Sequence, residues 1–262
     1  MTDATARVLE ALRRDERMLV FGDYDVDGTN GAAMLYLFLQ ELGGKVSCYI
    51  PDRIKEGYGI SRTGIDRAHQ EGVRLFISVD CGITAVDQVE YARTLGIDVL
   101  ICDHHEPGPV LPAAVALLDP IKPGDTYPFK HLSGCGVGFK LIQGLAQRLG
   151  KDALIPGYLD FVTLASTADI VSLTGENRVI VRNGLALINS TPRPGIKALI
   201  DAAGLKPRAS GSAACMAEST AWTPAYVALG SNLGDPPEQL RRACAALSGL
   251  PVTRLIAISA FY

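Results

Sequence analysis

Residues 19–28 have the sequence LVFGDYDVDG, in which an apolar run and a glycine precede Asp23, Asp25 and Asp27 at alternate positions. A short apolar run that ends in a turn signal is typical of a buried strand. Three carboxylates this close together repel one another, so the segment is costly without a compensating cation. The stretch therefore predicts a buried strand that presents a metal site at its carboxyl end.

An EF-hand loop is the competing interpretation of these aspartates, since the segment from Asp23 to Gly28 fits the D-x-D-x-D-G pattern. The twelfth position of such a loop requires a bidentate glutamate, and here it is Met34. The segment before the aspartates is also predicted as a strand, whereas an EF-hand needs a helix there. The EF-hand interpretation fails, and a solvated acidic turn stays as the alternative to a metal site.

Apolar runs alternate with helical segments from this stretch to about residue 120. Predicted helices occupy 30–42, 61–71 and 86–95, and predicted strands occupy 19–23, 46–52, 75–80, 98–103 and 114–120. Near-continuous apolar strands separated by helices indicate a parallel sheet that is covered on both faces. We therefore expect an α/β fold with a doubly wound parallel sheet.

The pattern changes after this α/β part to helical spacing without strands, and then to a stretch rich in alanine and serine. A strand, a loop, a helix and a second strand are predicted at the C-terminal end. We expect an α/β domain over 1–132, a helical segment that completes it over 133–207, a linker or junction over 208–224, and a small βαβ fragment over 225–262.

Acidic residues also follow two later predicted strands. Asp80 ends one of them, and Asp103 ends another and is followed by His104 and His105. Because ligands of open parallel sheets bind outside the carboxyl ends of the strands, we expect these groups to gather beside the first aspartates. Taken singly, Asp80 has the alternative of a cap or turn residue, and the two histidines have that of surface residues.

Asp169 lies in an apolar, helix-like run, LASTADIV, where a carboxylate needs a strong partner. A metal would supply that partner, as would an arginine or a helix N-terminus. Carboxylates with one imidazole favour Mn²⁺ or Mg²⁺ over structural zinc. Two such ions that share a carboxylate can direct a water-derived nucleophile at phosphorus and neutralise the phosphate. The sequence contains no G-x-S-x-G, Walker A or Rossmann motif, so it predicts metal-dependent phosphoester hydrolysis.

Composition fits a globular chain with a core, since 48% of the 262 residues are hydrophobic and 20% are charged. The net charge of −3 gives no basic footprint for nucleic acid, although bound cations would reverse the sign of the acidic clusters. No apolar run approaches the roughly 20 residues that span a bilayer, and the N-terminus lacks a secretory signal pattern. We expect a cytoplasmic protein without a membrane partner, and the six cysteines, which form no CxxC pair, as buried thiols.

Five segments resemble, in order and spacing, the motifs of the RecJ exonucleases within the DHH phosphoesterase superfamily. They are GDYDVDG at 22–28, IPDRIKEGYGIS at 50–61, SVDCGIT at 78–84, DHH at 103–105 and ASTADIV at 165–171. The resemblance covers about residues 19–207. It implies an enzyme of DNA repair and recombination that hydrolyses single-stranded DNA from the 5′ end with two Mn²⁺ or Mg²⁺ ions.

The resemblance also implies which residues hold each ion. One ion is implied to bind Asp25 and Asp80, with Asp23 completing its site, and the other is implied to share Asp80 and to bind Asp27, His104 and Asp169. Some relatives have a histidine two residues before the position of Asp23. Phe21 stands there in this chain, which implies a weaker first site or one that relies on water.

Substrate contacts are implied at two places. His105 is implied to donate a hydrogen bond to the phosphate rather than to bind metal. A loop that contains Arg53, Lys55, Tyr58 and Gly59 is implied to lie near the nucleic-acid path, with an ordinary solvated loop as the alternative.

Two departures from the RecJ pattern leave other functions open. Nothing after Pro207 resembles the second, DHHA1-type domain, so we expect metal binding with a weaker grip on DNA. Residues 226–262, which include GSNLGD, resemble the start of hydroxymethyl-dihydropterin pyrophosphokinase without its magnesium and ATP residues. The alternatives are a non-catalytic remnant or fusion, a phosphoesterase for short oligonucleotides, cyclic dinucleotides or pyrophosphate, and, last, a folate-pathway kinase.

Overall fold

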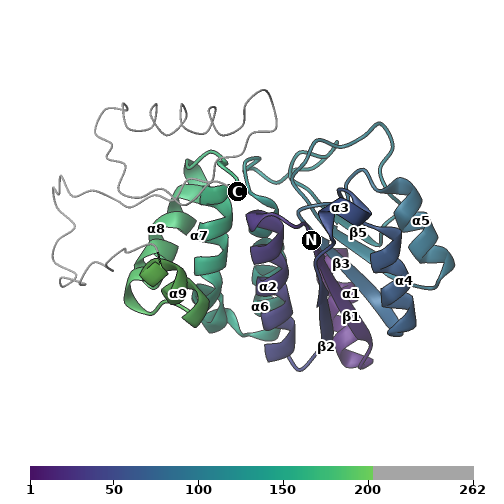
Figure 1. Ribbon diagram of the computed structural model, residues 1–262, viewed down its shortest axis with the longest axis horizontal. Helices are drawn as coiled ribbons and strands as arrows, with labels where there is room; N and C mark the ends of the chain where they lie inside the picture. The colour runs from purple at the N-terminus through teal and green to yellow at the C-terminus, as the bar shows by residue number, and fades with distance from the viewer. Residues whose placement is uncertain (203–262) are drawn as a thin grey trace. The chain divides into compact units, whose positions relative to one another are not determined.

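The computed structural model describes residues 1–202, and the predicted linker and C-terminal fragment therefore lie outside the described residues (Figure 1). The chain forms two compact units, Met1–Leu187 and Ile188–Tyr262. In the second unit the described residues comprise the end of helix α8 and the helix α9, Pro194–Ala202. The first unit contains the sheet and all of the predicted site residues.

A five-stranded, wholly parallel sheet forms the centre of the first unit, in the order β2-β1-β3-β4-β5. Its strands are β1 (Arg17–Gly22), β2 (Lys45–Tyr49), β3 (Val73–Val79), β4 (Asp98–Cys102) and β5 (Ala116–Leu118). Strand order reverses between β1 and β3, which is where doubly wound sheets open a crevice at the carboxyl ends of their strands. The predicted α/β fold with a doubly wound parallel sheet is confirmed.

Helices cover both faces of this sheet. The helices of the first unit are α1 (Thr2–Arg13), α2 (Val26–Glu41), α3 (Arg53–Glu56), α4 (Arg62–Gln70), α5 (Val86–Thr94), α6 (Gly134–Leu149), the short 3-10 helix η1 (Asp152–Tyr158), α7 (Leu159–Ala168) and the larger part of α8 (Gly175–Ser190). Among the described residues, no helix has the length and apolar character required to cross a membrane.

Alternate side chains of each strand enter two separate cores, one on each face of the sheet. Val20 and Ile77 pack with α1, α2 and α6 on one face, whereas Leu19 and Phe76 pack with α4 and α5 on the other. Burial of apolar surface on both faces of the sheet stabilises the unit by about 25 cal/mol for each Å² that is removed from water. Because both faces are buried, the strands are near-continuous apolar runs in the sequence.

Two helix starts differ from the sequence-based expectation. Helix α2 begins at Val26, four residues before the predicted start, because the carboxylate of Asp25 accepts a hydrogen bond from the Gly28 amide at 2.9 Å and caps the helix. The predicted loop after β2 begins with the helical turn α3, because Asp52 caps the amides of Ile54 and Lys55 in the same way. Asp27 thereby lies in the first turn of a helix.

Helix α7 approaches α8 very closely at Gly184. A Cβ atom at Gly184 would lie 1.9 Å from Thr163 Oγ1 and 2.5 Å from the Leu159 carbonyl oxygen, so only glycine fits there. α7 also packs against α2. This packing fixes the C-terminal end of α7, where Asp169 lies, next to the first turn of α2.

Candidate metal centre

The predicted ligands converge at the carboxyl ends of the strands. Their donor atoms form three groups, each with the atoms within 4.8 Å of one another: Asp23, Asp25 and Asp80; Asp27, His104 and Asp169; and Asp80, His104 and His105. They come from the ends of β1, β3 and β4, from the start of α2 and from the end of α7. The structure thus brings together the six residues that the sequence predicted as metal ligands and His105, which the resemblance implies at the phosphate.

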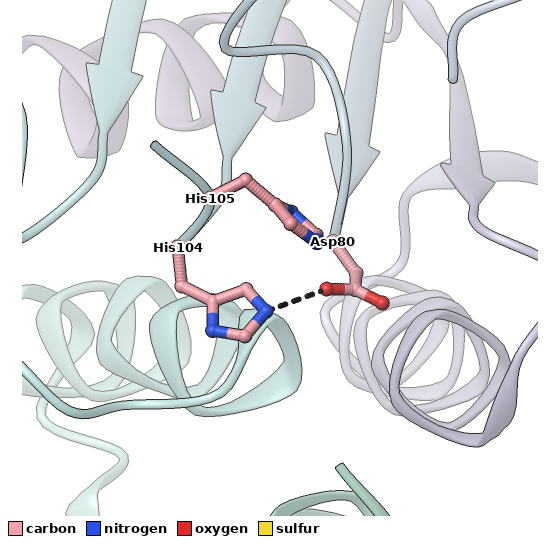
Figure 2. A group of neighbouring side chains, drawn as sticks. All are labelled: Asp80, His104 and His105. Carbon is pink, nitrogen blue, oxygen red and sulfur yellow. Dashed lines mark ion pairs between the residues drawn. The ribbon is translucent and has the colours of Figure 1, made fainter. Parts of the chain in front are cut away.

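His104 occupies the middle of this cluster. Its Nε2 atom lies 3.1 Å from Asp80 Oδ1, and Figure 2 shows the ring turned toward that carboxylate. The same nitrogen lies 3.7 Å from Asp27 Oδ2 and 3.7 Å from Asp169 Oδ2. One imidazole nitrogen and three carboxylates therefore point toward a common space.

Asp27 is held by the N-terminus of α6. Its Oδ2 accepts a hydrogen bond from the Gly134 amide at 2.6 Å, and its Oδ1 accepts one from the Cys135 amide at 2.9 Å. The helix dipole adds a favourable interaction with negative charge at this end. A Cβ atom at Gly134 would lie 2.5 Å from Asp80 Oδ1, so α6 can approach the cluster this closely only with glycine at its first position.

Asp80 adopts a left-handed backbone conformation, with φ of +64°. Its amide still donates to the Cys102 carbonyl at 2.9 Å, so the chain leaves the sheet directly after the last ladder hydrogen bond. A non-glycine residue in this conformation costs about 1–2 kcal/mol. Burial, followed by the charges of Asp27 and Asp25, raises the pKa of Asp80 to about 12.

The cluster contains more carboxylates than the protein itself compensates. Burial raises the pKa of Asp23 and of Asp169 to about 6, and it also raises the pKa of Asp27. Asp23 Oδ1, Asp80 Oδ1 and His104 Nε2 are buried and form no well-oriented hydrogen bond among the described residues, although His104 Nε2 and Asp80 Oδ1 lie 3.1 Å apart. Unsatisfied oxygen and imidazole atoms that face one another fit a divalent cation of the Mn²⁺ or Mg²⁺ type.

Asp103 contacts both histidines, the ring of His105 and the backbone of His104. The buried carboxylate accepts hydrogen bonds from the amides of Ile83 and His104 at 2.8 Å and from His105 Nδ1 at 2.7 Å. Burial acts to raise the pKa of Asp103, but these hydrogen bonds outweigh it and hold the pKa below the usual value. The hydrogen bond to Asp103 raises the pKa of His105. The strand-end position of Asp103 was visible in the sequence, but this positioning contribution was not.

Only some of the predicted substrate residues lie at the cluster. Tyr58 Oη lies 3.3 Å from His105 Nε2, and the Arg53 guanidinium lies over the ring of Tyr24 at 4.6 Å. Lys55 forms an ion pair with Asp52 at 3.0 Å and has a side chain that is 81% exposed. Gly59 adopts a left-handed backbone conformation with open space around it. Tyr58 thus contacts a cluster residue, whereas the lysine faces solvent.

Asp119 is a strand-end acid that the sequence-based site did not include. It follows β5 directly, is buried, and has one oxygen, Oδ2, without a hydrogen-bond partner in the described part of the chain. The signal that could have identified it was the same as for Asp80, an aspartate directly after an apolar run.

Comparisons with known proteins identify the family to which the sequence is similar. Residues 17–166 match the DHH family, N-terminal domain. The single-stranded-DNA-specific exonuclease RecJ of Bacillus subtilis is 42% identical over 204 residues, which cover 78% of this chain and 25% of that protein. RecJ of Escherichia coli is 38% identical over 205 residues, which cover 74% of this chain and 36% of that protein. The chain therefore spans between a quarter and somewhat over a third of the length of these relatives.

Solved structures also show similarity to RecJ exonucleases. A crystal structure of exonuclease RecJ bound to manganese matches with a TM-score of 0.71 and 36% identity, over 78% of this chain and 52% of that chain. RecJ from Thermus thermophilus in complex with Mn²⁺ matches with a TM-score of 0.66 and 34% identity, over 78% of this chain and 29% of that chain. The fold of this chain is thus similar to that of two manganese-bound RecJ exonucleases.

Proposed function

Because this chain belongs to the DHH family and has a RecJ-like DHH domain, we propose that it hydrolyses single-stranded DNA from the 5′ end with two Mn²⁺ or Mg²⁺ ions. The two relatives named above are single-stranded-DNA-specific exonucleases, and the two solved RecJ structures contain Mn²⁺. Each of these relatives is much longer than the matched region, so the activity of this chain is a proposal.

The observation that supports this proposal most directly is that buried oxygen and nitrogen atoms of Asp23, Asp80 and His104 face one another without a well-oriented hydrogen bond in residues 1–202. Buried carboxylates without partners are costly, and ligation to cations removes that cost. We assign Asp80 as the ligand that both ions share. The first ion also takes Asp23 and Asp25, and the second takes the group Asp27, His104 and Asp169.

The protein's own residues would bind and orient the phosphodiester. Bound cations would polarise the scissile phosphate and lower the pKa of the attacking water. His105, which Asp103 holds by a hydrogen bond and whose pKa is raised, would donate a hydrogen bond to a phosphate oxygen in its protonated form. Tyr58 Oη lies beside His105, and Arg53 supplies positive charge next to Asp23. Gly59 and Lys55 would contact the nucleic acid beyond the phosphate.

A cleavage assay on the intact chain tests this function. A 5′-labelled single-stranded oligonucleotide should be shortened in the presence of Mn²⁺ or Mg²⁺, and not in EDTA. Asp80→Asn should abolish cleavage, because it removes the charge shared by both ions. Asp66→Asn is the matched control, since Asp66 lies on α4, away from the cluster, and accepts a hydrogen bond from Tyr91 on α5.

The same assay separates the proposed function from its alternatives. Folded protein that binds Mn²⁺ but leaves every oligonucleotide intact would overturn the proposal and favour a non-catalytic domain. Cleavage of dinucleotides or pyrophosphate alone would favour a small-molecule phosphoesterase. Equal cleavage by the parent and by Asp80→Asn would show that the activity does not come from this centre.

A further inference from the structure

The loop 50–61 leaves the edge strand β2, forms the turn α3 and ends at the start of α4, and it carries Arg53 and Tyr58. Tyr58 stands between Gly57 and Gly59, which have φ of +81° and +84°. A Cβ atom at either glycine would have no neighbour within 4 Å, and Tyr58 is 58% exposed. Local packing therefore contributes little to the position of Tyr58, and the shape of the loop depends on other contacts.

Glu56 supplies such contacts from within the loop. Its Oε1 accepts hydrogen bonds from the Tyr49 hydroxyl at 2.8 Å and from the Asp52 amide at 2.9 Å. Its Oε2 accepts a hydrogen bond from the Ser61 hydroxyl at 2.6 Å. One carboxylate thus joins the end of β2, the first part of the loop and the last residue of the loop.

Two of these three donors are fixed by the body of the fold. The Tyr49 ring stacks on Phe21 with 5.6 Å between the ring centroids, and Phe21 is fully buried in one of the two cores. Ser61 is buried and caps α4, since its Oγ accepts a hydrogen bond from the Gly64 amide at 3.0 Å. The loop is therefore attached to rigid points on both sides of Tyr58.

Glu56 accepts these hydrogen bonds as an ionised carboxylate. Burial acts to raise the pKa of Glu56, but the hydrogen bonds, that from Ser61 first, outweigh burial and hold this pKa below its usual value. Hydrogen bonds to a charged acceptor are stronger than those between neutral groups. The three bonds together therefore favour the closed shape of the loop.

In this shape the loop brings its side chains to the metal centre. Tyr58 Oη lies 3.3 Å from His105 Nε2, and the Arg53 guanidinium lies 4.6 Å from the centroid of the Tyr24 ring. Both contacts run from the loop to residues that follow β1 and β4. Glu56 lies between Arg53 and Tyr58 in the chain, so its hydrogen bonds fix the backbone from which both side chains extend.

We propose that Glu56 is a positioning residue for the substrate, and that by closing the loop 50–61 it keeps Arg53 and Tyr58 at the metal centre before the nucleic acid binds. This inference rests on the proposed function, since it takes these two side chains as substrate contacts. A loop that is already ordered loses less entropy when it binds. Because Glu56 acts through the loop, its removal should weaken the binding of DNA rather than that of the cations.

Steady-state kinetics of the intact chain on a single-stranded oligonucleotide provide the first test. If Glu56→Ala leaves the loop closed for about a tenth of the time, KM should rise about tenfold, because apparent affinity falls with the populated fraction. The kcat at saturating oligonucleotide and the Kd for Mn²⁺ should stay close to those of the parent. Tyr49→Phe removes one donor and keeps the stacked ring, so it should raise KM in the same direction.

Glu71→Ala is the matched control. Glu71 also joins β2 to α4, since it accepts hydrogen bonds from Ser47 Oγ at 3.0 Å and from Arg67 Nε at 2.7 Å. It lies at the end of α4 that is remote from the loop. The control variant loses a carboxylate of the same size without touching the loop, and its KM should equal that of the parent.

Limited proteolysis with trypsin reports on the loop without any substrate. Arg53 and Lys55 are trypsin sites within the loop. Cleavage after them should be about tenfold faster in Glu56→Ala than in the parent or in Glu71→Ala, because cleavage follows the population of the open form. Circular dichroism identifies which variants are folded, and Tyr49→Phe takes the place of Glu56→Ala in both tests if the alanine variant is not folded.

The outcomes separate this inference from the proposed function. Parent-like KM or parent-like tryptic cleavage of the loop in the folded variant would overturn the inference. Weaker Mn²⁺ binding in that variant, or an equal rise of KM in Glu71→Ala, would also overturn it, because the effect would then not act through the loop. A parent chain that cleaves no oligonucleotide would overturn the proposed function, while the proteolysis comparison would still decide whether Glu56 holds the loop closed.

Discussion

Asp80 is buried and has a left-handed backbone conformation. Its carboxyl pKa, about 12, lies well above the value of about 6 for Asp23 and Asp169. Because its pKa is raised to about 12, the carboxyl group is protonated at neutral pH in the metal-free protein. Asparagine is a close match to that protonated form. The residue should therefore be dispensable for the metal-free fold and essential once the cations bind.

Thermal unfolding of Asp80→Asn tests this view. The metal-free variant should differ from the parent by less than about 1 kcal/mol in free energy of unfolding. Asparagine has nearly the same shape as protonated aspartate, so the substitution leaves no cavity and no buried charge. Mn²⁺ at 100 times the parent's Kd should stabilise the parent by about 2.7 kcal/mol and the variant by almost nothing. A variant that Mn²⁺ stabilises as much as the parent would contradict the assignment of Asp80 as the shared ligand.

Ile170 is a second strained residue of the site region. It directly follows Asp169, has φ of +57° and is 64% exposed, so packing does not compensate for its conformation. A β-branched residue is unusual in the left-handed region, where helix ends commonly have glycine. The strain lies one residue from a proposed ligand.

Replacing Ile170 by glycine should therefore stabilise the protein. The left-handed conformation costs isoleucine about 1–2 kcal/mol, and the extra freedom of glycine in the unfolded chain offsets about 0.5–1 kcal/mol of that gain. Urea denaturation should show a net increase of up to about 1.5 kcal/mol in the free energy of unfolding for Ile170→Gly. Leu173→Gly, at a partly exposed position without a positive φ, should be destabilising, and a loss of stability in both variants would refute the argument.

Much of the candidate centre could be predicted at the level of single residues. Asp23 and Asp80 each end an apolar run, and the rule that ligands gather at strand ends brings them together without coordinates. The hydrogen bond of Asp103 to His105 could not be predicted, because hydrogen-bond direction depends on side-chain orientation. The sequence shows an acid at a strand end but not which atom it faces.

At the level of elements, the N-terminus of α6 decides how closely a helix can approach the cluster. Gly134 and Cys135 donate their amides to Asp27, and a Cβ at position 134 would collide with Asp80. The two amides at the start of α6 can reach the Asp27 carboxylate only if the first residue of the helix has no side chain. That requirement is specific to this end of the helix.

Gly134→Ala should accordingly destabilise the protein by about 1–3 kcal/mol and weaken Mn²⁺ binding, since overpacking forces the backbone or Asp80 to move. Gly138→Ala in the same helix is the matched control. Its Cβ would lie 3.5 Å from Leu35 Cδ1, an ordinary contact, and alanine gains about 0.5–1 kcal/mol over glycine inside a helix. Denaturation and calorimetry of both variants check this contrast, which equal effects at the two positions would rule out.

Element types were predicted better than element starts. The strands were recognisable because both faces of the sheet are buried and their sequences are almost wholly apolar. The start of α2 was placed at residue 30 because Gly28 and the aspartates indicate a turn. The cap that Asp25 forms with the Gly28 amide moves the start to Val26, and this contact is a feature of conformation rather than of composition.

For the whole molecule, the buried acids make stability depend on pH in opposite ways with and without metal. The folded pKa values of Asp23 and Asp169 are raised to about 6, and that of Asp80 to about 12, above the value of about 3.9 for an unfolded aspartate. Such groups stabilise the fold fully below about pH 3.9, and their contribution is lost as pH rises through the folded pKa.

Thermal unfolding between pH 5 and pH 8 checks this sign. In EDTA, the cluster should make the melting temperature fall as pH rises. With saturating Mn²⁺, it should rise with pH over the same window, because metal binding requires deprotonated ligands and releases protons. Asp103, whose pKa is lowered, loses its stabilisation only at more acidic pH. Two parallel curves would contradict the assignment of the buried acids as metal ligands.

The parallel, doubly wound architecture followed from the alternation of elements, but the strand order did not. Any order that keeps right-handed crossovers satisfies the apolar pattern equally well. The reversal between β1 and β3 depends on which face each crossover helix covers. That choice is made by side-chain packing over the whole unit.

The proposed ligands Asp27 and Asp169 enclose most of the length of the first unit. A cation held by residues this far apart in the chain would act as a reversible cross-link between the start of α2 and the end of α7. Closing a loop of this size restricts the unfolded chain, as a disulfide does, yet the link opens whenever the ion leaves. The ion concentration would then control how often the far end of this unit detaches, and with it the exposure of the chain to proteases.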